Sequence, residues 1–356
     1  MREVDCIIVG QGIAGTLLSF ELIDAGLSVL VFDTPHHQGA SLVASGVINP
    51  VTGRRVVETW QIDTLLPLAQ RTYNKISEYL SVPPVASPIE VLALHANEQM
   101  RMAYEKRLKE GSSYIKGFEA KKMQGYLKDL SNGAHIISPA LLIDLQTLLP
   151  AYKANLQKHQ QVVEKRFNWD QLQQTSQHNP LVYSDADMQI KAKWVIATEG
   201  VEGASNPYFN ELPFRYNKGE ALIISAAALP RDYIYKLNYS IVPWKGEDLF
   251  WVGSTYQWEF KDALPTASFK QSVTKFLDDV LSVPYEVVDH IASVRPASVN
   301  RRPFAGFHEK SSRIGVLNGL GTKGCSLAPL LAHEWREHLT SGKAFNSEVA
   351  INGPRQ

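Results

Sequence analysis

The pattern of apolar and polar positions at the start of the chain predicts a strand, a helix and a second strand. The apolar run at residues 4–9 predicts a short buried strand, because charged residues precede it and glycine follows it. Leucine and isoleucine recur at helical spacing over residues 16–26, and Gly26 marks the end of that helix. A second apolar run, residues 28–32, predicts another buried strand, and it stops at Asp33.

The turn between the first strand and the helix has the pattern Gly-x-Gly-x-x-Gly, formed by Gly10, Gly12 and Gly15. Such a turn lets the backbone approach a pyrophosphate, and the following helix presents free N–H groups to it. Asp33 lies 23 positions after Gly10 and can accept hydrogen bonds from ribose hydroxyls. The other interpretation is a glycine turn in an unrelated α/β protein. We predict dinucleotide contacts from Gly10, Gly12, Ile13, Ala14, Gly15, Asp33 and Thr34.

This first motif alone does not distinguish FAD from NAD. The pattern occurs once more, near the C-terminus, at residues 319–324. No apolar strand ending in an acid follows the helix of the second match, so it does not complete a second dinucleotide unit. One tightly held dinucleotide, with electrons leaving to another acceptor, is the simpler interpretation.

Composition and charge narrow the class of protein. A length of 356 residues suits about two domains, and 44% hydrophobic with 20% charged residues is typical of a globular chain. The 36 basic residues balance the 36 acidic ones, which argues against general electrostatic binding of nucleic acid. Two cysteines exclude a disulfide framework, and no apolar run reaches the roughly 18 residues of a membrane span. We expect a cytoplasmic protein.

Several later segments lie in the order of known flavoprotein motifs: residues 41–50, 194–200, 241–243, 252–255, 293–296 and 318–329. They resemble, in turn, a loop under the flavin, the strand that closes the cofactor fold, two strands of a substrate sheet, an arginine–proline motif and a glycine turn beside the flavin ring. Together they are similar to the D-amino-acid oxidase family, in its glycine oxidase and sarcosine oxidase group. The likeness runs from residue 4 to about residue 339.

This resemblance implies an α/β fold in which a Rossmann-type FAD-binding domain is interleaved with an α+β substrate domain built on a mostly antiparallel sheet. The FAD-binding domain would comprise residues 1–80, 135–212 and 293–356, and the substrate domain residues 81–134 and 213–292. A proline-rich stretch at residues 81–88 agrees with the first boundary. A helical pattern is expected at residues 141–159, after Pro139.

The resemblance also implies FAD bound non-covalently, since the cysteine that carries the flavin in some members has no counterpart near the arginine motif. The second glycine turn would place N–H groups and a helix N-terminus beside the flavin, where they stabilise its anionic reduced form. Beyond the first turn, the implied cofactor contacts are Ser41, Ser45, Gly46, Val47, Phe167, Thr198, Gly200, Gly319, Leu320, Gly321, Thr322, Lys323 and Gly324.

Arg295 is the expected substrate residue, because the family's arginine at this position binds the substrate carboxylate. A planar guanidinium can hold a carboxylate through two parallel hydrogen bonds; the alternative is a structural ion pair. Residues 239–260 contain seven aromatics, where the chain average of 10% predicts about two. They either wall a pocket in which Tyr239 or Tyr256 offers a hydroxyl, or they suit a half-buried sheet. Trp251 occupies the position at which sarcosine oxidases carry a lysine that promotes reaction with oxygen. Oxygen is therefore not assured as the electron acceptor.

We therefore expect an enzyme that oxidises the carbon–nitrogen bond of a small amino acid or N-substituted glycine. Hydride would pass to flavin N5, and the resulting imine would hydrolyse. The alternative is a stand-alone tRNA-modifying enzyme that removes the carboxymethyl group of a wobble carboxymethylaminomethyl-uridine. That alternative follows from a likeness to the C-terminal flavin domain of the bifunctional enzyme of 5-methylaminomethyl-2-thiouridine synthesis. The zero net charge does not favour tRNA, and a third hypothesis is a flavin-holding protein without turnover.

Overall fold

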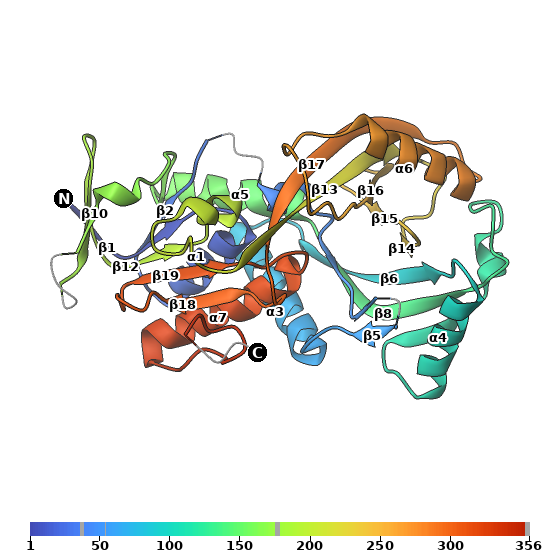
Figure 1. Cartoon of the computed structure of the whole chain (residues 1–356), viewed down its shortest axis with the longest axis horizontal. Helices are drawn as coiled ribbons and strands as arrows, with labels where there is room; N and C mark the ends of the chain where they lie inside the picture. The colour runs from blue at the N-terminus through green and yellow to red at the C-terminus, as the bar shows by residue number, and fades with distance from the viewer. Residues whose placement is uncertain (36–38, 54, 175–178, 353–356) are drawn as a thin grey trace.

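The computed structural model describes residues 1–35, 39–53, 55–174 and 179–352. Figure 1 shows an elongated molecule with two lobes, each organised around one large sheet. The N-terminus lies at the outer end of the first lobe, and the chain passes between the lobes several times, as the mixing of colours shows.

The first sheet has a parallel core in the order β9-β2-β1-β12-β19. Ile7 and Ile8 of the central strand are fully buried, because parallel strands covered on both faces need continuous apolar runs. The strand predicted at residues 4–9 is thus confirmed. The sheet contains β1 (Arg2–Val9), β2 (Val29–Phe32), β9 (Val162–Val163), β10 (Leu172–Gln173), β11 (Leu181–Ser184), β12 (Gln189–Ala197), β18 (Phe304–Phe307) and β19 (Ile314–Asn318).

Four helices pack together in the first lobe (Figure 1), and they belong to the same buried apolar cluster. These are α1 (Ile13–Asp24), α3 (Ile62–Leu80), α5 (Leu145–Lys158) and α7 (Gly324–Ser341). The predicted first helix is therefore present and begins three residues early, directly after Gly12. None of the helices in the described ranges is long and apolar enough to cross a membrane.

The second sheet follows the order β17-β13-β16-β15-β14-β6-β8-β3, with β7 also on β8. Its neighbours are antiparallel except for β14 and β6. The predicted fold class is confirmed. The strands are β3 (Val47–Ile48), β6 (Ala86–Leu94), β7 (Ile115–Phe118), β8 (Ala134–Ile143), β13 (Phe214–Ser225), β14 (Tyr233–Lys236), β15 (Ser240–Pro243), β16 (Leu249–Gly253) and β17 (Glu286–Ser298).

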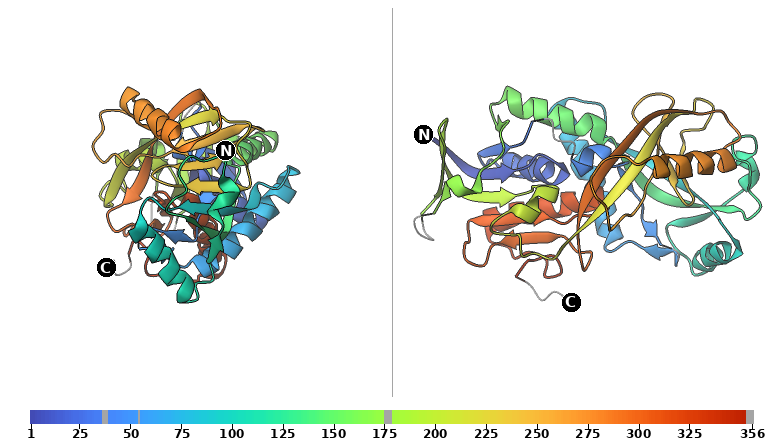
Figure 2. Two further views of the ribbon diagram at one scale, coloured as in Figure 1. Left: turned by 90° about the vertical axis from the view of Figure 1, so that its right-hand side faces the viewer. Right: turned by 45° about the horizontal axis from the view of Figure 1, so that its top comes forward.

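The two long strands β13 and β17 connect the lobes. Figure 2 shows them as a pair that runs from the second lobe to the edge of the first. Helix α6 (Ala267–Val280) covers the outer face of this sheet and shares its apolar cluster. Smaller elements are α2 (Ala40–Val43), α4 (Glu98–Lys109) and the hairpin of β4 (Val51–Thr52) and β5 (Val57–Glu58).

The helix expected from residue 141 begins later, at Leu145 of α5. Residues up to Ile143 extend β8 instead, because they pair with β6 and with β3. The boundary between β8 and α5 therefore depends on pairing with strands that are distant in the sequence. It does not follow from the helical spacing of the local sequence. The proposed domain limits at residues 80, 134, 212 and 292 remain a prediction, although residue 135 lies inside β8.

Candidate flavin and substrate site

The first glycine turn closes tightly against the end of β1. Gly10 has φ +101°, a conformation that suits glycine, and its N–H donates to the carbonyl of Phe32 (2.7 Å). A Cβ at Gly15 would overlap the carbonyl oxygen of Gly10 and lie 2.7 Å from Thr198 Oγ1. Helix α1 can therefore start directly above the sheet, with the free N–H groups of its first turn at the carboxyl ends of the parallel strands.

Asp33 lies at this turn, as predicted, at the end of β2. Its Oδ1 accepts the N–H of Gln11 (3.0 Å), and its Oδ2 pairs with Lys153 Nζ (3.1 Å). The carboxylate is thus held in place by the turn and by α5. Each carboxylate oxygen has a second lone pair available for a ribose hydroxyl. Thr34 follows it and is half-buried.

The segment at residues 41–48 passes from the helix N-terminus to the second sheet. Ser41 Oγ accepts the N–H of Ile13 (3.1 Å), so it lies directly at the start of α1. Gly46 has φ +79°, and its carbonyl accepts the N–H of Ile143 (2.9 Å). Ser45 and Val47 flank this fixed glycine and are half-buried. The structure therefore brings the predicted loop to the predicted turn.

Residues after β12 join the two glycine turns. Thr198 Oγ1 donates to the carbonyls of Val9 (2.8 Å) and Gly10 (2.7 Å). Two residues later, the carbonyl of Gly200 accepts from Asn318 Nδ2 (2.9 Å), while Asn318 Oδ1 accepts the N–H of Gly319 (2.8 Å). Thr198 and Gly200 thus lie between the two predicted cofactor turns.

The second glycine turn lies beside the first. Gly319 and Gly321 have φ values of +75° and +56°, and α7 starts at Gly324. A Cβ on Gly324 would lie 3.3 Å from Ile13 Cγ2, so the N-termini of α1 and α7 are neighbours. Two helix N-termini in one place give a region of positive potential. Within this turn Leu320 is buried, Lys323 is half-buried and Thr322 is exposed.

These features fit an FAD molecule. The two glycine turns, the anchored carboxylate and the adjacent helix ends supply what a dinucleotide with an anionic diphosphate and a redox ring requires. The contact of Phe167 with the cofactor remains a prediction. The Phe167 ring is buried against Phe32 (centroids 5.0 Å apart) and Tyr183 (4.6 Å), which makes it part of the apolar cluster beside the sheet.

Arg295 lies on β17, opposite Asn217 of β13. Its Nη1 donates to Asn217 Oδ1 (2.7 Å) and to the carbonyl of Thr255 (3.2 Å), and its Nη2 donates to Ser254 Oγ (2.7 Å). All three acceptors are neutral, and no carboxylate in the described ranges pairs with this guanidinium. Burial lowers the pKa of Arg295, although an arginine remains charged. The alternative of a structural ion pair is therefore excluded for the residues that the structure describes.

The arginine lies near the second glycine turn. The carbonyl of Pro296 accepts the N–H of Gly321 (2.9 Å), which ties the end of β17 to that turn. A Cβ at Gly219 would overlap the Arg295 guanidinium, so the absence of a side chain there makes room for it. The residue expected to bind a carboxylate thus lies beside the turn expected to lie along the flavin ring.

The two tyrosine candidates lie in different places. The Tyr256 ring is 5.2 Å from the Arg295 guanidinium carbon, and 60% of the residue is exposed. Tyr239 instead packs edge-on against Phe269 (5.9 Å) and Phe276 (5.2 Å) in the cluster under α6. Leu222 of β13 belongs to this cluster, and alternation along that strand puts it on the face opposite Asn217 and Arg295. Tyr239 lines a separate hollow of about 460 Å³.

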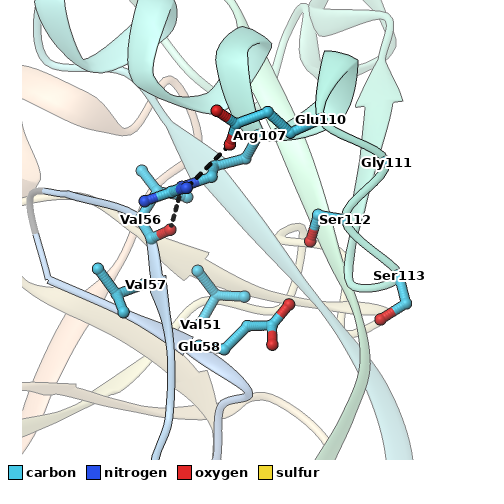
Figure 3. A pocket seen from close by; sticks show the side chains of 9 residues that line it. All are labelled: Val51, Val56, Val57, Glu58, Arg107, Glu110, Gly111, Ser112 and Ser113. Atoms are coloured by element: carbon cyan, nitrogen blue, oxygen red, sulfur yellow. Dashed lines mark hydrogen bonds and ion pairs between the residues drawn. The ribbon is translucent and has the colours of Figure 1, made fainter.

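Another hollow of about 460 Å³ lies between the β4–β5 hairpin and the end of α4, as Figure 3 shows. No predicted site residue lines it. Its cation, Arg107, donates to the carboxylate of Glu110 (2.8 Å) and to the carbonyl of Val56 (3.1 Å). The charge of Arg107 is therefore neutralised within the protein.

Sequence reasoning missed several residues of the site. Lys153 anchors Asp33 from a helix 120 positions away, and Asn217 and Ser254 hold Arg295 from separate strands and loops. No local motif marks them. The one usable signal was the pattern Asn217-x-Gly219, whose alternation puts both residues on one face of a strand.

Comparisons with known proteins agree with this geometry. The sequence profile of the FAD dependent oxidoreductase family, DAO, matches residues 5–337. Glycine oxidase from Geobacillus kaustophilus has a similar structure, with a TM-score of 0.79, 18% identity and coverage of 97% of this chain and 96% of that one. Iminodiacetate oxidase from Chelativorans sp. BNC1 gives a TM-score of 0.72, 19% identity and coverage of 95% and 96%. L-proline dehydrogenase from P. horikoshii gives 0.72, 15% identity and coverage of 96% and 95%. The chain belongs to the DAO family of FAD dependent oxidoreductases.

Proposed function

We propose that this enzyme oxidises the carbon–nitrogen bond of a small amino acid or an N-substituted glycine. The observation that carries the proposal is the Arg295 guanidinium, which is fixed by three neutral acceptors beside the second glycine turn. A cation held in this way has its charge available for a carboxylate. Structural neighbours named as oxidases of glycine and iminodiacetate support the choice of substrate class.

The chain's own residues would bind and orient the substrate. Arg295 holds the carboxylate, and Tyr256 covers the guanidinium from the solvent side. Fixing the carboxylate beside the glycine turn limits which substrate atom can face the cofactor. FAD, when bound, would act as the hydride acceptor.

We also propose that the FAD is held without a covalent bond. Cys6 and Cys325 are both buried, and burial raises the pKa of the Cys325 thiol to about 12. A thiol in that state is a poor nucleophile at neutral pH. Denaturing the purified holoprotein should release all of its flavin into the soluble fraction.

The deciding experiment is an anaerobic screen of amino acids, N-methyl glycines and undermodified tRNA for bleaching of the bound flavin. We expect at least one amino acid or N-substituted glycine to bleach it. Arg295→Ala should lose this bleaching at the same substrate concentration while retaining FAD. If no amine reduces the flavin, or if the variant keeps wild-type kinetics, the proposal is wrong.

A second candidate function is the demodification of a tRNA wobble uridine that carries a carboxymethylaminomethyl group. The observation that favours it is the aromatic and basic surface near Arg295. Arg215 stacks on Trp258 at 4.5 Å, with Trp258 47% exposed, and arginine–aromatic surfaces of this kind bind bases and phosphates. Binding of tRNA should then weaken steeply as salt rises, whereas binding of a small amino acid should change little.

A further inference from the structure

The Asn217 side chain has one group that the protein does not use. Asn217 is 2% exposed on β13, directly opposite Arg295. Its Oδ1 accepts from Arg295 Nη1 at 2.7 Å. Its Nδ2 is buried and has no hydrogen-bond partner in the described part of the chain.

The orientation of this amide follows from its neighbour. A guanidinium has donors only, and an amide nitrogen cannot accept a hydrogen bond. Turning the amide over would therefore oppose two donors and lose the bond to Arg295. The unpaired group is thus the donor Nδ2, and a buried donor without an acceptor costs about 1–3 kcal/mol.

The groups around this donor also lack a negative partner. Among the described residues, Arg295 has neutral acceptors only, and one of them is the Ser254 hydroxyl, which accepts from Nη2. Gly219, on the same strand face, has no side chain, and the Arg295 guanidinium lies in the space this leaves. An arginine charge and a spare amide donor next to each other suit one ligand with two acceptor oxygens, which is a carboxylate.

We propose that Asn217 is a second recognition residue for the substrate carboxylate. Oδ1 fixes the guanidinium, and Nδ2 donates to one carboxylate oxygen while Arg295 supplies the charge. This assignment rests on the proposed function and deepens it. The additional hydrogen bond from Nδ2 selects for a carboxylate more strongly than the charge of Arg295 would by itself. The competing acceptor is a carbonyl oxygen of the flavin.

The test uses the oxidised holoprotein with acetate as the probe, followed by the change in flavin absorbance. Asn217→Ala should weaken acetate binding about tenfold, the factor that corresponds to 1.4 kcal/mol. Asn206→Ala is the matched control: Asn206 is 1% exposed, but its Nδ2 donates to Glu199 (2.6 Å) and its Oδ1 accepts from Tyr208 N–H (2.9 Å). We expect this control to lose stability and keep its acetate affinity.

A second readout separates a direct contact from a role in holding Arg295. In protein labelled with ¹⁵N-asparagine, the side-chain NH₂ signal that disappears in Asn217→Ala should shift when acetate is added to the holoprotein. If that signal shifts when FAD binds and does not move with acetate, its acceptor is the cofactor and the inference is overturned. A signal that moves with neither ligand overturns it as well.

The outcomes distinguish this inference from the function on which it rests. If Arg295→Ala loses acetate binding and Asn217→Ala binds as wild type does, the inference fails and the proposed function stands. If acetate does not bind the wild-type holoprotein, or binds equally to Arg295→Ala, both fail.

Discussion

The two faces of strand β13 treat buried charge in opposite ways. On the outer face, the Glu220 side chain is fully buried and contacts Lys218 Nζ (3.4 Å), His290 Nε2 (3.0 Å) and the N–H and hydroxyl of Thr266 (2.6 and 2.9 Å). On the inner face, the Arg295 guanidinium contacts neutral oxygens, and no carboxylate of the described residues pairs with it.

The difference separates a structural charge from a binding charge. The outer carboxylate has its charge and its lone pairs satisfied, and through Thr266 it fixes the start of α6. The inner guanidinium has a fixed direction and an unneutralised charge. Since a buried ion is costly unless it is paired, the unpaired ion is the one that a ligand can complete.

The largest effect should come from breaking the outer network. Glu220→Ala leaves Lys218 buried without its carboxylate, and we expect a loss of about 3–5 kcal/mol in the free energy of unfolding. Urea unfolding of the holoprotein measures it. Glu220→Gln, which keeps hydrogen-bonding groups at the same place, should lose less. A change below about 0.5 kcal/mol, the usual size for surface substitutions, would show that the two faces do not differ.

A matched pair of cation substitutions sharpens the comparison. Lys218→Met removes the cation of a buried pair and should cost about 3 kcal/mol. Arg295→Met removes an unpaired cation; relief of its desolvation offsets the lost hydrogen bonds, so we expect a change within about 1 kcal/mol. Thermal unfolding of both variants gives the comparison. Equal losses would place Arg295 among the structural charges.

A third buried site, the stacked histidines His95 and His135, extends the comparison to a pair of side chains that is neutral at pH 7. Their rings lie 5.0 Å apart, and His135 Nδ1 lies 3.2 Å from His95 Nε2. Burial and the neighbouring His135 lower the pKa of His95 to about 4, and burial lowers the pKa of His135. Between pH 6.5 and about 4 the unfolded chain binds protons that the folded chain does not. The free energy of unfolding therefore decreases as the pH is lowered through that window.

Each full unit of such a pKa difference corresponds to about 1.4 kcal/mol. Urea midpoints measured from pH 7 to pH 4 should therefore fall, and the double variant His95→Gln/His135→Gln should show a flatter profile. An unchanged slope in the double variant would contradict the assignment.

The smallest effect should come from the exposed stack beside the site. Trp258→Ala removes a half-exposed ring from Arg215, and we expect less than about 0.5 kcal/mol in stability. Acetate affinity should not change, because the ring does not contact Arg295. If the tRNA-modifying alternative holds, tRNA affinity should fall by about 1–3 kcal/mol for the lost base stacking.

Parts of the site could be predicted where the chemistry is local. The turn from Gly10 to Gly15 and the acid at position 33 follow one another within a single β-α-β unit, so spacing alone predicted their arrangement. The resemblance then implied that Arg295 binds the substrate, and the structure shows that it lies beside the second glycine turn. Tyr239 was predicted as an alternative hydroxyl donor for the same pocket, and its ring packs against Phe269 and Phe276 under α6.

The amino-acid sequence by itself determined the first glycine turn, since that turn depends on short spacings, and the resemblance of its later segments implied FAD and the family. Only the tertiary structure decided which side chains surround Arg295 and whether its charge is paired. Asn217, Thr255 and Arg295 meet through the pairing of β13 with β17 and the loop after β16. Contacts between segments that are distant in the chain depend on strand register and burial, which no local pattern specifies.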